Sequence, residues 1–340
     1  MPGLNIAVDL GSGSIKVYIQ GRGIVYCQAN AVAYDAYTDE VIAIGNSAKE
    51  MLEKTPETID LVLPIKSGVI ADFSSMKHIL SNIIEKVCRW RIFKPNIIIS
   101  APSGCTALEK KTIIDVVCAA GAGKVSVIDE PVASALGCAM NISRPYGVMV
   151  IDIGAGTSDI AVITMGCVAY STSLKIAGDD MNEAICQYIK REKDIVIGYH
   201  TAEEIKKTVG CAVETEEEFE MSVNGKDFVT SMPVMFSVTS KEICAALSDC
   251  VKAIINETRN VLEEIPYEMY SDICNDGIIL TGGSAKLKGL DIAFRNKFNI
   301  PVTVAADSEH TAAKGAGYAL KDLAAYEDNG YVFKIKQQLR

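Results

Sequence analysis

The chain has 340 residues, with 33 basic and 43 acidic side chains and a formal net charge of -10. A chain of this length usually folds as about two domains, and 49% hydrophobic with 22% charged residues are values of ordinary globular proteins. This composition excludes a disordered or collagen-like chain, and the acidic balance without a basic stripe argues against a nucleic-acid partner.

The sequence contains no candidate for a membrane-spanning helix or a signal peptide. A spanning helix needs about eighteen or more consecutive apolar residues, and no run approaches that length. Residues 1–5 lack the basic and apolar segments of a signal peptide. The 11 cysteines form no Cys-x-x-Cys pair and the 3 histidines fit no ligand spacing, so we expect reduced thiols in a cytoplasmic protein rather than zinc or disulfides.

The chain opens with a strand, a glycine-rich turn and a second strand. Apolar residues 4–8 precede the turn Asp-Leu-Gly-Ser-Gly-Ser at residues 9–14, and apolar residues 15–19 follow it. This order is typical of a β-hairpin. Residues 31–72 carry short strands and a segment bounded by prolines, and we interpret them as a small inserted subdomain.

Helices and buried strands alternate in the next hundred residues or so. Apolar residues recur at helical spacing from Met76 to Val87, and Thr106-x-x-Glu109 is a capping box that predicts a helix as far as Ala119. Predominantly apolar runs at residues 97–99 and 125–128 predict strands that are buried on both faces. The alternation predicts an α/β architecture.

The hairpin motif returns in the second half of the chain. Residues 152–157 read Asp-Ile-Gly-Ala-Gly-Thr and lie between apolar residues 147–151 and 160–163. Two unrelated turns would each explain a glycine, but not the same order of residues twice. The repeat therefore predicts two related α/β domains that begin with the same structure.

Residues 181–238 differ in character from the rest of this half, and we interpret them as its inserted subdomain. We expect a helix opened by Thr201-x-x-Glu204, an exposed acidic strand edge at residues 216–220 and a hairpin that turns at Asn224-Gly225. A long helix opened by Thr239-x-x-Glu242 and a buried strand over residues 278–280 follow.

We place the first domain at residues 1–145, with residues 315–340 returning to it, and the second domain at residues 146–314.

The two repeated turns suit the binding of a polyphosphate. Backbone N–H groups in such turns point the same way and bind anions, and glycine lets phosphate oxygens approach the backbone. Asp9 and Asp152 precede the turns and could hold a hydrated Mg²⁺, while Lys16 could add a point charge. No GxxxxGK[ST] motif is present and the turns lead into strands, which excludes a Walker P-loop and a Rossmann site. A third turn, Thr281-Gly282-Gly283-Ser284, would let a base and ribose pack against bare backbone.

These motifs also occur in the order of a known family. The similar segments are AVDLGSGSIKVYI, LPIKSGVIADF, APSGCTALEKK, VIDEPVASALG, VIDIGAGTSDIAVI, AGDDMNEAI, HTAEEIKKTVGCA, GIILTGGSAKLKGLD and AADSEHTAAKGAGYAL. In them the chain resembles the actin/Hsp70/sugar-kinase ATPase superfamily, and most closely the bacterial actins of the MreB family. The resemblance implies the actin-like ATPase fold: two related α/β domains, each with a smaller inserted subdomain, and a nucleotide in the cleft between them.

The resemblance also implies a role for each residue that matches a family motif. Glu130 would position or activate the attacking water, and Thr157 would lie near the terminal phosphate. Asp9 and Asp152 would sit beside Mg²⁺ and hold it through water. The residues implied to contact ATP are Gly11, Ser12, Gly13, Ser14, Lys16, Gly154, Ala155, Gly156, Thr157, Gly178, Asp179, Glu203, Lys206, Gly282, Gly283 and Ser284, of which Glu203 and Lys206 would flank the ribose and base.

The resemblance implies an ATP-binding, slowly hydrolysing actin whose filaments lie on the membrane and help to determine cell shape by organising cell-wall synthesis. Its partners would be further copies of itself, the inner face of the cytoplasmic membrane and membrane proteins of the cell-wall elongation machinery. A membrane contact would fall at Trp90, Ile92 and Phe93, although Trp90 and Phe93 could instead pack into the protein's own core.

Some motifs depart from the family pattern. The first turn reads Gly-Ser-Gly-Ser-Ile-Lys instead of Gly-Thr-Ala-Asn-Thr, Asp129 replaces a glutamate, and the third turn ends in Gly-Gly-Ser. These departures indicate a divergent member. They leave two alternatives open, a dedicated actin-like filament for plasmid or organelle positioning and a non-polymerising ATPase or kinase of the superfamily.

Overall fold

The computed structural model describes residues 4–88, 93–214, 217–320 and 334–335. In these residues, six strands form one large sheet in the order β19-β10-β9-β1-β2-β3. The strands are β1 (Asn5–Leu10), β2 (Ser14–Ile19), β3 (Gly23–Ala29), β9 (Asn96–Ala101), β10 (Lys124–Asp129) and β19 (Lys334–Ile335). We call the part of the molecule that is built on this sheet the first lobe.

The second lobe is built on another sheet, which has the order β13-β12-β11-β17-β18 in the described residues. Its strands are β11 (Val148–Ile153), β12 (Ser158–Thr164), β13 (Cys167–Leu174), β17 (Ile278–Thr281) and β18 (Val302–Val304). β1 and β2 form an antiparallel hairpin with β9 parallel to β1, and β11, β12 and β17 repeat this arrangement. The predicted structural repeat is therefore confirmed.

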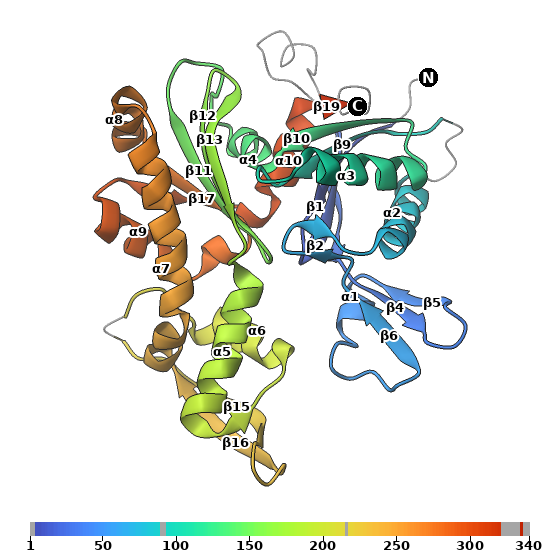
Figure 1. The fold of residues 1–340 in the computed structure, drawn as a ribbon, viewed down its shortest axis with the longest axis vertical. Coiled ribbons are helices and arrows are strands. Elements are labelled where there is room, and N and C mark those ends of the chain that lie inside the picture. Colours follow the sequence, from blue (N-terminus) through green and yellow to red (C-terminus); the bar gives the residue numbers. More distant parts are fainter. Residues whose placement is uncertain (1–3, 89–92, 215–216, 321–333, 336–340) are drawn as a thin grey trace.

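Helices cover the outer faces of both sheets (Figure 1). The first lobe has α2 (Phe73–Val87) and α3 (Ala107–Ala119), and the second has α7 (Ser240–Glu264), α8 (Tyr267–Asp276) and α9 (Leu290–Phe298). The predicted capping boxes at Thr106 and Thr239 are both present. Among the described residues, no helix is both long and apolar enough to span a bilayer.

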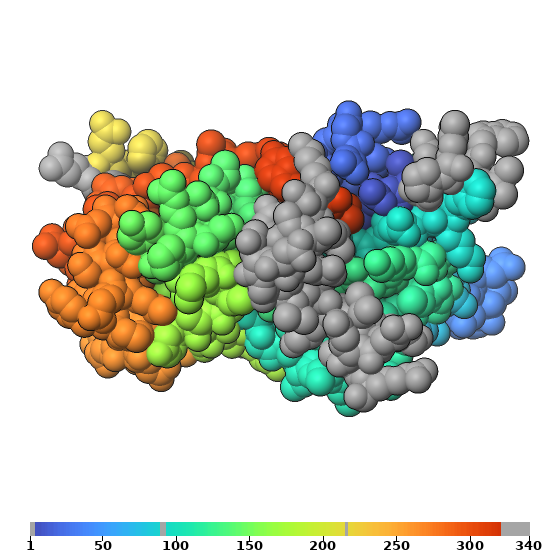
Figure 2. All heavy atoms as spheres, turned by 90° about the horizontal axis from the view of Figure 1, so that it is seen from above, coloured from blue at the N-terminus to red at the C-terminus, as the bar shows by residue number. Residues whose placement is uncertain are grey.

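Two short helices fill the space between the lobes, α4 (Glu130–Gly137) and α10 (Thr311–Ala319). A buried cluster joins them to Ala7 and Ile98 of the first sheet and to Val150 of the second. Because Ile6 and Ile97 face the α2 and α3 side instead, the central strands are buried on both faces, as predicted. The two lobes lie side by side when the molecule is seen from above (Figure 2).

Glycines let α4 and α10 pack backbone against backbone. A Cβ on Gly315 would lie 1.7 Å from the carbonyl oxygen of Ala133, and one on Gly137 would lie 2.0 Å from that of Thr311. No side chain fits at either position, so α4 is held firmly between the lobes.

A smaller subdomain projects from the same end of each lobe (Figure 1). In the first it consists of β4 (Val32–Asp35), β5 (Val41–Ile44), α1 (Asn46–Lys49), β6 (Ile59–Val62), β7 (Ile65–Lys66) and β8 (Val69–Ile70). In the second it consists of α5 (Gly178–Lys193), β14 (Ile195–Val196), α6 (Tyr199–Val209), β15 (Glu220–Asp227) and β16 (Pro233–Thr239). Two single turns, η1 (Ser284–Lys286) and η2 (Ser308–His310), complete the elements.

Two local predictions in the second subdomain are wrong. Asn224 and Gly225 lie inside β15, paired with β16, and the chain reverses after Asp227. Gly225 is needed for packing, because a Cβ there would lie 2.4 Å from Cγ2 of Ile195. Thr201 does not cap a helix either, because α6 begins earlier, after Gly198.

Candidate functional site

A cavity of about 540 Å³ opens between the two lobes. Every residue that the resemblance implied to contact ATP or Mg²⁺ lines it, and so does Glu130. The lining residues from that set are Asp9, Gly11, Ser12, Gly13, Ser14, Lys16, Glu130, Asp152, Gly154, Ala155, Gly156, Thr157, Gly178, Asp179, Glu203, Lys206, Gly282, Gly283 and Ser284.

The two repeated turns face each other across this cavity and nearly touch. A Cβ on Gly13 would lie 2.7 Å from Cβ of Ala155, and one on Gly156 would lie 2.6 Å from Oγ of Ser12. Ser12 Oγ also accepts a hydrogen bond from the N–H of Gly68, 3.1 Å away. Glycine is therefore required in both turns because the turns approach each other so closely.

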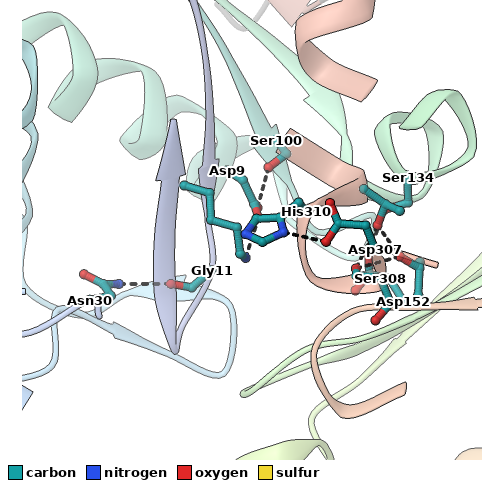
Figure 3. A network of polar contacts seen from close by, with 12 residues as sticks. Asp9, Gly11, Asn30, Ser100, Ser134, Asp152, Asp307, Ser308 and His310 are labelled. Atoms are coloured by element: carbon teal, nitrogen blue, oxygen red, sulfur yellow. Dashed lines mark hydrogen bonds and ion pairs between the residues drawn. The ribbon is translucent and has the colours of Figure 1, made fainter. Parts of the chain in front are cut away.

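Each repeated aspartate accepts a hydrogen bond from a buried serine (Figure 3). Ser100 Oγ donates to Asp9 Oδ1 at 2.9 Å, and Ser134 Oγ donates to Asp152 Oδ2 at 2.7 Å. Lys16 Nζ forms an ion pair with Asp9 Oδ2 at 3.0 Å. The side chains of Asp9 and Asp152 are thus held at the inner end of the cavity.

The hairpin registers give the two aspartates different neighbours. Lys16 lies opposite Asp9 on β2, whereas Asp159 lies opposite Asp152 on β12. Asp159 in turn accepts hydrogen bonds from the backbone N–H and the hydroxyl of Ser103, both at 3.1 Å, which connect the lobes.

At the inner end of the cavity, the carboxylates of Asp9, Glu130 and Asp152 outnumber the ammonium group of Lys16. Burial and neighbouring carboxylates raise the pKa of Glu130 and of Asp152, and burial also raises the pKa of Asp159. Burial alone would lower the pKa of Lys16, but the carboxylates of Asp9 and Asp152 outweigh it, and the pKa of Lys16 is raised. A divalent cation would relieve the repulsion among these carboxylates.

The carboxylates of Asp9 and Asp152 fit Mg²⁺ as an incomplete set of ligands. In the part of the chain that the structure describes, no group of three or more His, Cys, Asp or Glu side chains is arranged to hold a metal ion. Asp9 and Asp152 could therefore supply only part of a coordination shell. Mg²⁺ suits such a site because it keeps several waters and takes other ligands from phosphates.

Glu130 is the first residue of α4 and directly follows Asp129, which forms an ion pair with Lys110. A carboxylate in the first turn of a helix is favoured by the helix dipole. Proline at the next position, Pro131, fixes the backbone where the helix starts. The local sequence thus sets Glu130 at the junction between the first sheet and α4.

The opposite end of the cavity is formed by α5, α6 and the third glycine-rich turn. Lys206 Nζ donates to the carbonyl of Gly178 at 2.6 Å, and Ser284 Oγ donates to that of Gly154 at 2.7 Å. Burial lowers the pKa of Lys206 to about 8. Burial would raise the pKa of Glu203, but Lys207 and Lys49 outweigh it and lower that pKa to about 2.

Residues of α1, of the turn that follows it and of α6 connect the lobes across the outer end of the cavity. Lys49 Nζ pairs with Glu203 Oε2 at 3.1 Å, and Glu53 Oε2 accepts the N–H of Tyr199 at 2.8 Å. His200 Nε2 donates to the carbonyl of Lys49 at 3.0 Å. We call Lys49, Glu53, Tyr199, His200 and Glu203 the outer contact.

The outer contact explains why the Thr201 prediction fails. The first N–H of α6 is satisfied by Glu53 from the other lobe, so no local capping box is needed. Conversely, His200 of the second lobe donates to the carbonyl of Lys49, the last residue of α1 in the first lobe. Each lobe therefore satisfies a helix end of the other.

Sequence reasoning missed Ser100, Ser103 and Ser134, and it named only Glu203 from the outer contact. The only signal for Ser134 is that it interrupts the apolar residues of α4, and Ser100 similarly follows an apolar run. Nothing in the local sequence pairs these serines with aspartates far along the chain.

Of the residues expected to contact a membrane, Trp90, Ile92 and Phe93, the structure describes Phe93 alone. Trp90 and Ile92 lie outside the described residues. Phe93 is described and its side chain is 56% exposed, so Phe93 is not packed into the core.

Known proteins share this fold over almost the whole chain. The sequence model of the MreB/Mbl protein family matches residues 3–328. The cell shape-determining protein Mbl of Bacillus cereus is 38% identical over 320 residues, which cover 94% of this chain and 96% of that protein.

Two solved structures extend this similarity. MreB 5 of Spiroplasma citri bound to AMPPNP has a TM-score of 0.92 and 34% identity, and covers 97% of this chain and 99% of that chain. The MamK double helical filament has a TM-score of 0.82 and 20% identity over 94% of this chain and 98% of that chain, a likeness of fold alone.

Proposed function

Because the chain belongs to the MreB/Mbl protein family, we propose that it binds ATP with Mg²⁺ between its lobes, hydrolyses the nucleotide slowly and assembles into filaments. The chain has the actin-like ATPase fold and is a member of a family of cell shape-determining, nucleotide-binding actins. The observation that carries the proposal is that both repeated turns meet at one cavity lined by all the matching residues.

The phosphates would lie between the two turns, at residues 11–14 and 154–157, with Lys16 beside them. Ribose and base would extend toward Glu203, Lys206 and the turn at residues 282–284. The volume of the cavity, about 540 Å³, is in the range of sites for small ligands. The homologue MreB 5 of Spiroplasma citri, whose structure contains AMPPNP, supports this assignment.

Hydrolysis would rely on positioning and electrostatics more than on covalent catalysis. Glu130 would orient the attacking water and accept its proton, and Thr157 would lie beside the terminal phosphate. Asp9 and Asp152 would hold Mg²⁺ through water, and the ion would neutralise charge on the phosphates. Burial and the neighbouring carboxylates raise the pKa of Glu130, which makes its carboxylate a stronger base toward the water.

We propose the same domain division as the sequence suggested. Residues 1–145 with the insertion 31–72 would form the first domain, and residues 146–314 with the insertion 181–238 the second. Two large sheets support this division, and so does β19, which pairs with β10 after α10 has passed between the lobes. Residues 315–340 would thus return to the first domain.

The remaining parts of the proposal rest on the family. Filaments would lie on the inner face of the cytoplasmic membrane through Trp90, Ile92 and Phe93, and would organise membrane proteins of cell-wall synthesis. The exposed side chain of Phe93 supports the contact, because Phe can bury in the headgroup boundary while adjacent basic residues meet anionic lipid.

Electron microscopy and phosphate release on the same samples test the proposal. With ATP and Mg²⁺ we expect filaments, and a phosphate release that increases as the protein assembles. A protein that neither binds ATP nor assembles in its presence would contradict the proposal. Phosphate release at the same rate below and above the assembly concentration would show that hydrolysis is not coupled to polymerisation.

A further inference from the structure

Ser134 is the one hydroxyl among the apolar and small residues that form the body of α4, from Pro131 to Gly137. Its side chain is completely buried, with Ala133 and Ala135 on either side also at 0% exposure. Since alanine packs at both neighbouring positions, packing alone does not require a hydroxyl at residue 134. The hydroxyl instead donates to Asp152 Oδ2 at 2.7 Å.

This hydrogen bond joins three parts of the site. Asp152 belongs to β11 of the second lobe, whereas Ser134 lies four residues after Glu130 in α4. Residues four apart lie on the same face of a helix, so Glu130 and Ser134 share one face. Because α4 is clamped against α10 at Gly137 and Gly315, it is a rigid link between Glu130 and Asp152.

The hydrogen bond from Ser134 matters more for the orientation of the Asp152 carboxylate than the hydrogen bond from Ser100 does for that of Asp9. Asp9 has both Ser100 and the ammonium group of Lys16 to hold its two oxygens. Asp152 faces Asp159 in the hairpin register instead of a lysine. The side of Asp152 that turns toward α4 is therefore held by Ser134 (Figure 3).

We propose that Ser134 is a positioning residue that aims the Asp152 carboxylate at the cavity and sets its distance from Glu130. The inference rests on the proposed function, because Asp152 matters through the Mg²⁺ that accompanies the nucleotide. Partners that orient a metal-binding carboxylate typically change metal affinity by about 10–100-fold when they are removed. Ser134 acts on Mg²⁺-dependent binding and leaves nucleotide binding without the metal unchanged.

The test measures binding of a fluorescent ADP, without relying on turnover. Nucleotide affinity is titrated with Mg²⁺ and compared with affinity in EDTA for the parent, Ser134→Ala and Ser134→Thr. For Ser134→Ala we expect the half-saturating Mg²⁺ concentration to rise about tenfold with unchanged affinity in EDTA. Ser134→Thr keeps the hydroxyl and should return the value toward that of the parent. The matched control is Ser75→Ala, because Ser75 is also buried and hydrogen-bonded but lies away from the cavity.

A double-mutant cycle separates positioning from a general loss of stability. If Ser134 acts through Asp152, Ser134→Ala should have no further effect on the Mg²⁺ dependence of an Asp152→Ala variant, which lacks the acceptor oxygen. An unchanged half-saturating Mg²⁺ concentration in Ser134→Ala, or additive effects in the cycle, would overturn the inference and leave the proposed function standing. Parent protein that binds no nucleotide with Mg²⁺ would overturn both.

Discussion

The outer contact should slow the release of bound nucleotide, and Glu53→Ala should accelerate it. The carboxylate of Glu53 caps α6 from the opposite lobe, so the cap exists only while the lobes are closed. Loss of a helix cap destabilises the arrangement that contains it by about 1 kcal/mol. Because Glu53 is exposed, we add no further free energy for its charge at the N-terminus of α6. A change of about 1 kcal/mol corresponds to about a fivefold shift toward the open state.

Stopped-flow measurement of the release of a fluorescent ADP tests this reasoning. We expect Glu53→Ala to release the nucleotide about fivefold faster than the parent. Glu57→Ala is the matched control, because Glu57 is an exposed glutamate of the same subdomain. Release from Glu53→Ala at the parental rate would refute the idea that the outer contact retains nucleotide.

Three further predictions address hydrolysis, pH dependence and the membrane. Glu130→Ala should bind nucleotide as the parent does but release phosphate about 10²–10⁴-fold more slowly in filaments; phosphate release at the parental rate would remove Glu130 from the mechanism. The fold lowers the pKa of Glu203 from 4.5 to about 2. Ionised Glu203 therefore contributes fully to the stability of the fold above pH 4.5, and this contribution is lost as the pH falls from 4.5 toward about 2. Urea unfolding of Glu203→Gln should therefore depend less on pH in this window than unfolding of the parent, and parallel curves would count against the ion pairs of Glu203. Filaments of Trp90→Ser/Phe93→Ser should pellet less with anionic liposomes than parental filaments do, and equal pelleting would place the membrane contact elsewhere.

The parts of the fold that could be predicted are those with a local cause. Residues 97–99 and all but Ser126 of residues 125–128 are apolar because both faces of these strands are buried. The capping boxes at Thr106 and Thr239 satisfy backbone groups within one turn. The repeated turns could be recognised because each needs glycine where it meets the other.

The predictions that failed depend on contacts between distant residues. The N-terminus of α6 is capped by Glu53, which lies 146 residues earlier in the chain, so a local capping rule could not locate it. Gly225 serves the packing of β15 against Ile195 and not a turn. Ser134 was missed for the same reason, since its partner Asp152 belongs to the other lobe.

The most direct test of the central claim is a crystal structure of the protein with Mg²⁺ and AMPPNP. The account predicts the phosphates between residues 11–14 and 154–157, the metal beside Asp9 and Asp152, and the terminal phosphate within reach of a water held by Glu130. Nucleotide bound outside the cavity between the lobes, or with its phosphates away from both turns, would contradict the account.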